Sequence, residues 1–365
     1  MTGVVVFILT LFFLVLVHEY GHYAMARLFG VGIEEFGVGF PPAIIRRLRG
    51  NTIFSLNWIP LGGFVRIKGE EKSDDAPDSF SVQPAYKRAL IIAAGVLMNA
   101  LVAAVLFSAG FLIGMPQDVT DGAPKGAIVE NVSYRVMAVL PESPADGVVI
   151  PGESIASLDG HTFVHLQDLQ QYVRNHVSVP VSVILKSETG ERTLTITPTE
   201  FKREGVAEPV VGFGVQLSSI GVIRYPWYWA PVEGVRMTWQ NFVLIVRTIG
   251  GATANLVRGV PAGVDISGPV GIAVVTGNVV HLGLLYLLQF VALLSINLSF
   301  VNLLPIPALD GGRLLFILIE VVRRKPVASH IESKIHQVGF SILLLIILLV
   351  TFSDISRLAS FGHFW

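Results

Sequence analysis

The sequence predicts a polytopic α-helical membrane protein with about four transmembrane helices, a membrane-associated β-hairpin and an inserted extracytoplasmic α+β domain. The mean hydropathy is +0.64. Only 15% of the 365 residues are charged, whereas soluble domains average about 25%. Four uncharged apolar stretches are each long enough to cross a bilayer core of roughly 30 Å. A long segment between the second and third stretches has short apolar runs separated by turn signals, a pattern typical of a β-rich domain.

These stretches set the expected domain boundaries. We expect a first transmembrane helix in 1–30, a cytoplasmic-side loop with the β-hairpin in 31–87, a second transmembrane helix in 88–115, the inserted domain in 124–200, a linker with an interfacial amphipathic helix in 201–281, a third transmembrane helix in 282–322 and a fourth in 335–353. The first stretch lacks a basic region before it and a small-residue cleavage site, so we do not expect it to be a cleaved signal peptide.

Basic residues indicate the orientation in the membrane. They gather in the loop between the first and second spans and in the loop between the third and fourth: Arg46, Arg47, Arg49, Arg66, Lys68, Lys72, Lys87, Arg88, Arg313, Arg323, Arg324, Lys325 and Lys334. By the positive-inside rule both loops face the cytoplasm, so both termini and the inserted domain are extracytoplasmic. We therefore expect a multi-pass protein of the inner (cytoplasmic) membrane.

Overall charge and cysteine content exclude several functions. The formal net charge of -1 argues against nucleic acid as a partner. The chain has no cysteine, so it has neither disulfides nor a thiol nucleophile, and any metal must be held by His, Asp or Glu.

The segment Thr52–Lys68 is rich in β-branched and aromatic residues and is punctuated by Gly and Pro. This pattern favours strands or a hairpin over a helix. An edge strand here could pair with an extended substrate segment, and the alternative is an ordinary cytoplasmic hairpin.

An amphipathic helix is expected after the aromatic cluster Tyr225–Trp229. Apolar residues recur there at helical spacing: Val235, Trp239, Phe242, Val246 and Ile249. We expect this helix to lie in the membrane interface, and the alternative is a helix packed on the inserted domain.

The run His18-Glu19-Tyr20-Gly21-His22 lies within the first predicted span. Positions i and i+4 share a helix face, so the imidazoles of His18 and His22 can point at one ion. Glu19 lies beside that ion without being an obligatory ligand. This HExxH spacing is typical of zinc hydrolases, in which the glutamate is the general base.

A catalytic zinc site needs a third protein ligand. Asp310 is the first carboxylate after the uncharged run of the third span, and it is followed by Gly311 and Gly312. A carboxylate at membrane depth is costly unless it is paired or ligating, which favours a functional role. The alternative is a helix cap at the cytoplasmic end of the span.

These motifs together resemble a known family. HEYGH in the first span and NLLPIPALDGG in the third are similar to the site-2 protease family (intramembrane zinc metalloproteases, peptidase M50), and most similar to its bacterial members that cleave anti-sigma factors. The segments GGFVRIKGE, KRALIIAAGVLMN and ISGPVGIA resemble the family's hairpin, second span and approach to the third. The resemblance implies that His18, His22 and Asp310 hold one Zn²⁺ per chain, with Glu19 as catalytic base.

The resemblance also indicates where a substrate is held. It implies that Asn297 and Asn302 of the third span hold or orient the unwound substrate, although Asn297 could instead join helices. Further expected contacts are Gly62, Gly63, Phe64, Val65, Asn99 and Pro307. The family often has Gly-Pro-x-x-Asn in the second span, whereas Gly95-Val96-Leu97-Met98-Asn99 lacks the proline.

The inserted domain resembles a PDZ domain. Its matching residues are Ser143-Pro144-Ala145, Gly152-Glu153 and Leu158-Asp159-Gly160, with Tyr134–Val139 as the expected strand edge. Two roles fit such a domain: binding of a peptide C-terminus, or exclusion of substrates with bulky ectodomains.

The expected function is regulated intramembrane proteolysis of single-span membrane proteins such as anti-sigma factors. One alternative is a non-catalytic PDZ-bearing membrane scaffold or chaperone. A second is an ion transporter that uses intramembrane His and Asp, which predicts neither HExxH nor the inserted domain. Replacing Glu19 by Gln separates these classes, because only a protease should lose cleavage while keeping its metal.

Overall fold

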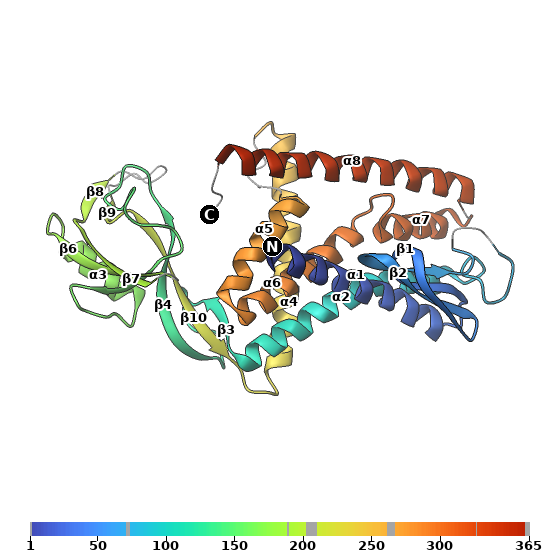
Figure 1. Cartoon of the computed structure of the whole chain (residues 1–365), viewed down its shortest axis with the longest axis horizontal. Helices are drawn as coiled ribbons and strands as arrows, with labels where there is room; N and C mark the ends of the chain where they lie inside the picture. Colours follow the sequence, from blue (N-terminus) through green and yellow to red (C-terminus); the bar gives the residue numbers. More distant parts are fainter. Residues whose placement is uncertain are drawn as a thin grey trace. The chain divides into compact units, whose positions relative to one another are not determined.

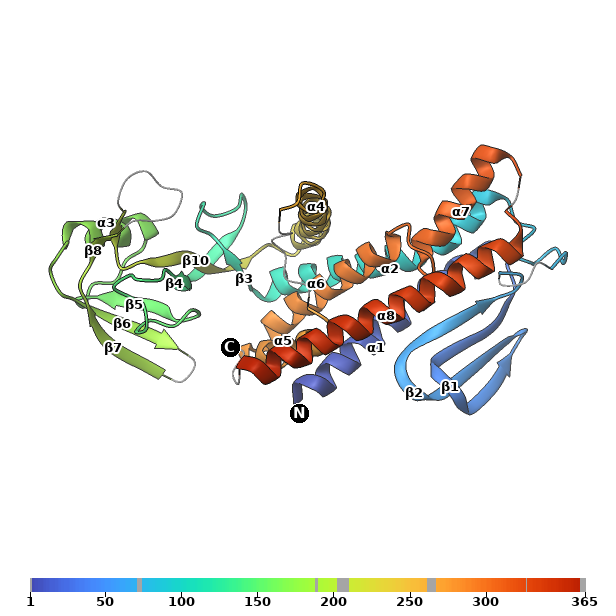
Figure 2. The same ribbon diagram turned by 90° about the horizontal axis from the view of Figure 1, so that it is seen from above.

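The computed structural model describes residues 2–70, 74–187, 190–201, 210–260, 267–325 and 327–361. The chain divides into two compact units. The helical unit runs to Gly110 and resumes at Pro231, and the sheet unit is Phe111–Ala230. Figure 1 colours both units along the sequence, and Figure 2 gives a second view of each.

The helical unit is built mainly from long apolar helices. Its helices are α1 (Thr2–Leu28), α2 (Ala85–Ile113), α4 (Ala230–Val257), α5 (Pro269–Leu282), α6 (Leu284–Leu303), α7 (Asp310–Arg323) and α8 (Ser329–Phe361). Among the described residues, four segments are long and apolar enough to cross a membrane: Thr2–Leu28, Ala85–Ile113, Leu284–Leu303 and Ile331–Arg357. Helix α4 is not one of these candidate spans.

A long antiparallel hairpin joins α1 to α2. Its strands are β1 (Ile33–Arg49) and β2 (Thr52–Ile67), with Ile33 opposite Ile67 and Arg49 opposite Thr52. The sequence predicted strands or a hairpin within Thr52–Lys68, whereas this segment is one strand that pairs with β1; β1 was not anticipated, because its glycines and the Pro41-Pro42 pair are typical of loops. Residues Glu35–Val38 of β1 lie opposite both Ile53–Leu56 and Gly63–Arg66 of β2, so the two strands bend back on each other and form a sheet wider than two rows.

The hairpin lies along the C-terminal half of α1 (Figure 2). A Cβ atom at Gly62 would lie 2.7 Å from Cγ1 of Val15, and one at Gly63 would lie 3.4 Å from Cδ1 of Leu16. The two glycines therefore allow β2 to approach the helix that carries the HExxH run.

The third predicted span is two helices rather than one. Helix α6 ends at Leu303 and α7 begins at Asp310, so residues 304–309 form a non-helical connection. Pro305 and Pro307 lie in it, and proline removes the backbone donors that a continuous helix needs. Helix α8 is longer than the expected span 335–353, because it extends from Ser329 to Phe361.

Helix α5 was not anticipated within the linker 201–281. Its N-terminus has Gly268 at the cap position and Pro269 in the first turn. Asp354 of α8 replaces the missing cap: its carboxylate accepts the N–H groups of Gly268 (3.2 Å) and Gly271 (2.8 Å). This carboxylate stabilises the helix end because it satisfies free N–H groups and matches the positive end of the helix dipole.

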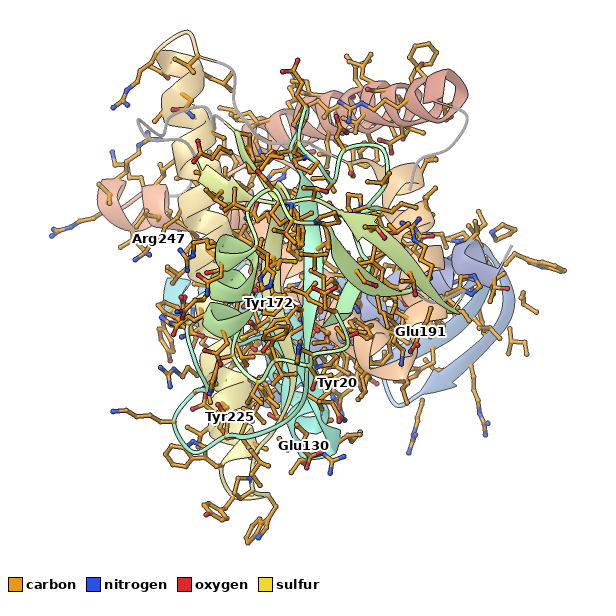
Figure 3. All side chains as sticks on the ribbon, turned by 90° about the vertical axis from the view of Figure 1, so that its left-hand side faces the viewer. Tyr20, Glu130, Tyr172, Glu191, Tyr225 and Arg247 are labelled. Atoms are coloured by element: carbon orange, nitrogen blue, oxygen red, sulfur yellow. The ribbon has the colours of Figure 1, made fainter. Side chains whose placement is uncertain are left out.

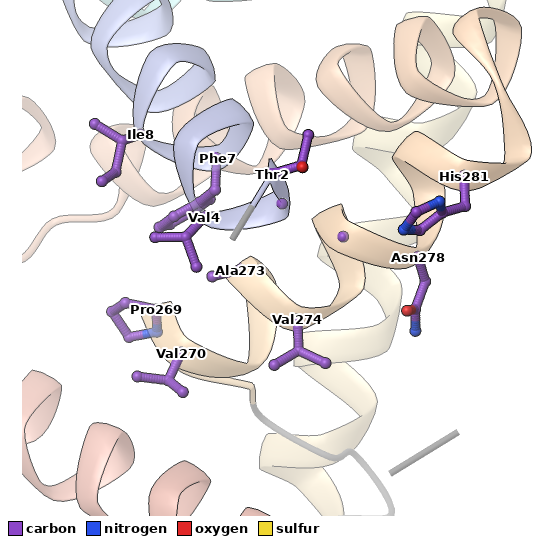
Figure 4. A pocket seen from close by; sticks show the side chains of 12 residues that line it. Thr2, Val4, Phe7, Ile8, Pro269, Val270, Ala273, Val274, Asn278 and His281 are labelled. Atoms are coloured by element: carbon purple, nitrogen blue, oxygen red, sulfur yellow. The ribbon is translucent and has the colours of Figure 1, made fainter. Parts of the chain in front are cut away.

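Helix α5 packs closely on the start of α1, because a Cβ at Gly3 would lie 2.4 Å from Cα of Gly277. An apolar pocket of about 560 Å³ lies beside this crossing (Figure 4). Its labelled lining comes from Thr2, Val4, Phe7 and Ile8 of α1 and Pro269, Val270, Ala273, Val274, Asn278 and His281 of α5. The HExxH residues do not line this pocket.

The sheet unit contains a six-stranded antiparallel sheet in the order β3-β10-β4-β5-β6-β7. Its elements are β3 (Met115–Asp118), β4 (Ile128–Val139), β5 (Ser154–Leu158), α3 (Leu166–Asn175), β6 (Val181–Ser187), β7 (Gly190–Ile196) and β10 (Val215–Arg224), with a separate pair β8 (Thr199–Phe201) and β9 (Val210–Gly212). The sheet therefore extends beyond the expected range 124–200 on both sides.

Helix α3 packs on this sheet through Leu169 and Val173, which are buried in the core of the unit. Tyr172, labelled in Figure 3, lies on the same helix and donates from its hydroxyl to Asp159 (2.8 Å). Tyr134–Val139 was expected to be a strand edge, and this was wrong, because β4 lies between β10 and β5 in the sheet. The long strand β10 was not anticipated, and it pairs with β4 from Ile128 to Val139.

Polar contacts fix two turns of the sheet unit. Asp159 and Gly160 both have positive φ angles, and the Asp159 carboxylate accepts the N–H of Ser182 (2.7 Å). That backbone bond, with the Tyr172 hydroxyl, lowers the pKa of Asp159. Arg192 donates to the buried Glu153 (2.7 Å) and lowers the pKa of that carboxyl. The Leu-Asp-Gly and Gly-Glu motifs thus have clear structural roles.

Candidate metal centre

Two imidazoles of α1 face a common point. His18 and His22 are buried, with exposed fractions of 6% and 7%. Their Nε2 atoms lie 3.2 Å apart. This arrangement follows from the helix itself, because residues four apart lie one above the other on the same face.

Asp310, at the start of α7, completes a triangle with these imidazoles. Its Oδ2 atom lies 2.9 Å from Nε2 of His18 and 3.4 Å from Nε2 of His22. Tetrahedral Zn²⁺ with ligand distances of 2.0–2.1 Å would separate its ligand atoms by about 3.3 Å. The three observed separations are close to that value, so the residues present fit a zinc ion.

The opposite ring nitrogens orient the two histidines. Nδ1 of His22 lies 2.9 Å from the carbonyl oxygen of Ile91 and must donate to it. In the neutral ring Nε2 then presents a lone pair toward the Asp310 carboxylate, and a metal cation between the two atoms would satisfy both. Buried Oδ2 of Asp310 has no hydrogen-bond donor among the described residues, which supports the same fit.

Asn99 of α2 lies behind His18. Its Nδ2 atom is 3.3 Å from Nδ1 of His18, and its Oδ1 atom is buried without a partner in the described chain. When Nε2 of His18 holds a metal, Nδ1 of His18 keeps its proton and must donate it. The side-chain amide of Asn99, rotated by 180°, then presents Oδ1 as the acceptor. Asn99 is fully buried, so it contacts the ring of His18 rather than an incoming substrate.

Glycines bring α2 against the two imidazoles. A Cβ at Gly95 would lie 2.4 Å from Nε2 of His22 and 2.7 Å from Cε1 of His18. A Cβ at Gly21 would lie 2.4 Å from the carbonyl oxygen of Ala94. Helix α2 is unbroken through Gly95 and Asn99, so this stretch without proline remains helical. The role of Gly95 was missed, because no local pattern marks which glycine faces a ligand.

Glycines also explain the position of Asp310. A Cβ at Gly311 would lie 2.1 Å from the carbonyl oxygen of Leu304, and one at Gly312 would lie 2.4 Å from that of Ile306. The connection 304–309 can therefore fold back over the first turn of α7 only if both positions lack side chains. This packing places Asp310 at the N-terminus of α7, facing α1.

Glu19 lies beside the triangle and contacts the hairpin. Its Oε2 atom accepts the backbone N–H of Val65 in β2 (3.1 Å). Glu19, His22, Val65 and Asp310 line a cavity of about 1240 Å³. The cavity is also lined by charged residues: Arg66, Glu70, Arg88, Arg313, Glu320 and Glu332. It gives water a polar route to His22, Asp310 and Glu19.

The remaining candidate residues differ in whether they line this cavity. Phe64 and Val65 line the cavity. Pro307 lies in the connection, where a Cβ at Gly339 of α8 would lie 2.4 Å from its Cβ. Asn302 is half-buried near the end of α6. Asn297 is exposed and donates to the carbonyl oxygen of Leu293 in its own helix (3.0 Å), so it is not drawn into the centre.

Comparison with known proteins gives consistent results along the chain. A family model described as peptidase family M50 matches residues 6–346. Zinc metalloprotease RasP of Geobacillus kaustophilus is 29% identical, covering 97% of this chain and 98% of its own. The regulator of sigma E protease of Salmonella typhi is 27% identical, covering 96% and 98%. The PDZ domain of the SdrC-like protein of Listeria monocytogenes is 26% identical, covers 25% of this chain and 92% of its own, and has a TM-score of 0.22.

Proposed function

Because the chain belongs to peptidase family M50, we propose that it hydrolyses a peptide bond within or beside the membrane at the centre formed by His18, His22 and Asp310. The protein is a zinc metalloprotease and a multi-pass membrane protein. The observation that carries the proposal is the triangle of ligand atoms with Glu19 beside it.

His18, His22 and Asp310 are the residues that would hold Zn²⁺, with Asn99 and the Ile91 carbonyl orienting the two rings. When bound, Zn²⁺ polarises a peptide carbonyl and lowers the pKa of a water molecule to about 7. Glu19 accepts the proton of the attacking water and delivers it to the leaving amide nitrogen. The Val65 N–H holds the Glu19 carboxylate at the cavity wall.

The open edge of β2 is the proposed site for the substrate backbone. Val65 lies opposite Phe36 of β1, yet its N–H points to Glu19. Residues Gly63–Ile67 of β2 form an outer row of the sheet, where every second N–H points away from the partner strand. The backbone carbonyl of an extended substrate that pairs with this edge would therefore accept the Val65 N–H beside the catalytic base. A helical substrate must unwind first, because its own backbone groups are already paired.

We infer that the substrates are single-span membrane proteins of the anti-sigma-factor kind; the Salmonella relative is named regulator of sigma E protease. We place the protein in the inner membrane with its termini outside, and we assign the sheet unit as an extracytoplasmic PDZ domain that binds a peptide C-terminus or excludes bulky ectodomains. The substrate is identified by comparing membrane-protein fragments from cells that carry the active enzyme or its E19Q variant.

The substitution Glu19→Gln tests the reaction. Gln keeps an oxygen for the Val65 N–H but cannot accept a proton, so zinc content should stay at one per chain. Cleavage of a co-expressed single-span reporter should fall at least about 100-fold, the contribution of a general base. Undiminished cleavage by E19Q would show that the mechanism is wrong. Zinc that survives Asp310→Ala would remove Asp310 from the ligand set.

A further inference from the structure

The connection that carries Asp310 contains a strained residue. Ala308, two residues before Asp310, has a φ angle of 80°. This left-handed conformation is unfavourable for residues other than glycine, so surrounding contacts must maintain it. Within the connection the N–H groups of Ile306 and Leu309 are accepted by the carbonyl oxygens of Leu304 and Ile306.

The N–H of Ala308 is instead accepted by a side chain of α8. Its acceptor is Nδ1 of His336, at 2.8 Å. Because a backbone N–H can only donate, Nδ1 must be unprotonated, and the proton of the neutral ring is on Nε2. The Nε2 atom is buried without a hydrogen-bond partner in the described chain. It lies 4.0 Å from Oε1 of Glu332, beyond hydrogen-bond distance.

Two further contacts hold the His336 ring against the connection. The ring of Phe316 in α7 lies 5.5 Å from it, centroid to centroid. Gly339, one turn further along α8, allows that helix to approach Pro307, because a Cβ there would lie 2.4 Å from Cβ of Pro307. His336 and Gly339 therefore form one face of α8 that fits residues 307 and 308.

We propose that His336 is a positioning residue for the metal centre. By accepting the Ala308 N–H, it maintains the left-handed conformation of Ala308, and this conformation directs the Asp310 carboxylate toward His18 and His22. The inference rests on the proposed zinc ligands and adds an outer contact from α8. It requires an acceptor at the δ position of residue 336, not merely a bulky or polar side chain.

Three substitutions at this position isolate the acceptor. His336→Leu removes it, and we expect zinc affinity to fall about 10- to 100-fold, as for other outer contacts of metal sites. His336→Asn places an oxygen close to the position of Nδ1 and should keep zinc affinity within about three-fold of wild type. In His336→Gln the amide oxygen lies one bond further along the side chain than Nδ1 does in His, so its zinc affinity should resemble that of His336→Leu.

The measurements use the full-length protein in detergent. Zinc affinity comes from competition with a chelator, and the visible absorption of the cobalt-substituted protein reports ligand geometry independently of activity. The expected result is a changed cobalt spectrum in H336L and H336Q and a preserved one in H336N. Val338→Ala is the matched control: this side chain of α8 is 60% exposed and does not line the cavity of the metal centre. Circular dichroism compares the folding of all variants.

The outcomes separate this inference from the proposed function. Wild-type zinc affinity and cobalt spectrum in H336L would overturn the inference, as would equal loss in H336N and H336L. If H336L does not fold, the comparison of H336N with H336Q decides the question, and equal behaviour of those two would overturn it. Zinc retained after Asp310→Ala would instead contradict the ligand set itself.

Discussion

Gly95 limits how closely α2 can approach the two ligand imidazoles. Any side chain at this position would overlap Nε2 of His22, the atom that faces Asp310. Metal sites tolerate ligand displacements of only about 0.5 Å. Space at one helix position is therefore as necessary for zinc binding as the ligands themselves.

We predict that Gly95→Ala weakens zinc binding at least about ten-fold, because the added methyl group displaces the rings. Gly250 of α4 is the matched control, since a Cβ there meets nothing within 4 Å. Gly250→Ala should leave zinc affinity unchanged and stabilise α4 by about 0.5–1 kcal/mol. Chelator competition on both variants checks this, and equal zinc affinity in both would show that Gly95 has no such role.

Asn99 should tune the centre through His18. Asn99→Leu removes the acceptor for the Nδ1–H of His18, so zinc affinity should fall about 10- to 100-fold. Asn99→Asp keeps an oxygen acceptor and should bind zinc more tightly than Asn99→Leu. Titration of zinc into the metal-free variants measures both constants. A similar affinity for the two would mean that Asn99 does not orient the ring.

Sequence reasoning found the local parts of this centre more readily than the distant ones. The spacing of His18 and His22 follows from helix geometry, and Asp310 is conspicuous as the first carboxylate after a long uncharged run. The structure brings all three together. Gly95 and His336 have no comparable local pattern, because their roles depend on which helix packs against the ligands.

At the scale of elements, the hairpin and the catalytic helix depend on each other. Strand β2 reaches α1 through the small surfaces of Gly62 and Gly63, and its open edge meets Glu19. Strand β1 could not be predicted, because its glycines and prolines are compatible with a strand only when bulges and a long partner are present. Helix α5 was missed for a similar reason, since its cap comes from Asp354 in another helix.

The open edge of β2 can be tested with proline. Val65→Pro deletes the N–H that points to Glu19 but no bond to β1, so the hairpin should persist. Losing one backbone hydrogen bond to the substrate should raise KM up to about ten-fold, and losing the donor that holds Glu19 should lower kcat as well. Zinc content should not change. Val65→Ala, which keeps the N–H, is the control, and steady-state cleavage of a reporter peptide by both variants gives the comparison.

Equal KM values for Val65→Pro and Val65→Ala would show that no substrate carbonyl uses this donor. A loss of zinc in Val65→Pro alone would show that the hairpin supports the metal centre instead of the substrate. The two results are distinguishable because the Val65 N–H is accepted by Glu19, which is not one of the three proposed ligands.

At the scale of the whole molecule, the charged cavity and the basic loops indicate the same side of the membrane. Arg88, at the start of α2, pairs with Glu320 of α7 (2.6 Å) and lines the cavity. Arg313 pairs with Glu70 there. These residues belong to or adjoin the loops that the positive-inside rule places in the cytoplasm. We therefore propose that water reaches the centre from the cytoplasmic side.

This topology can be tested directly because the chain has no cysteine. Val164 in the sheet unit is 78% exposed, and Lys325 between α7 and α8 is also exposed. In intact spheroplasts a membrane-impermeant maleimide should modify Val164→Cys at once and Lys325→Cys only after permeabilisation. The opposite pattern would invert the topology, and water would then enter from outside the cell. Modification of both residues before permeabilisation would mean that an even number of segments lies between them, which contradicts the crossing assigned to Leu284–Leu303.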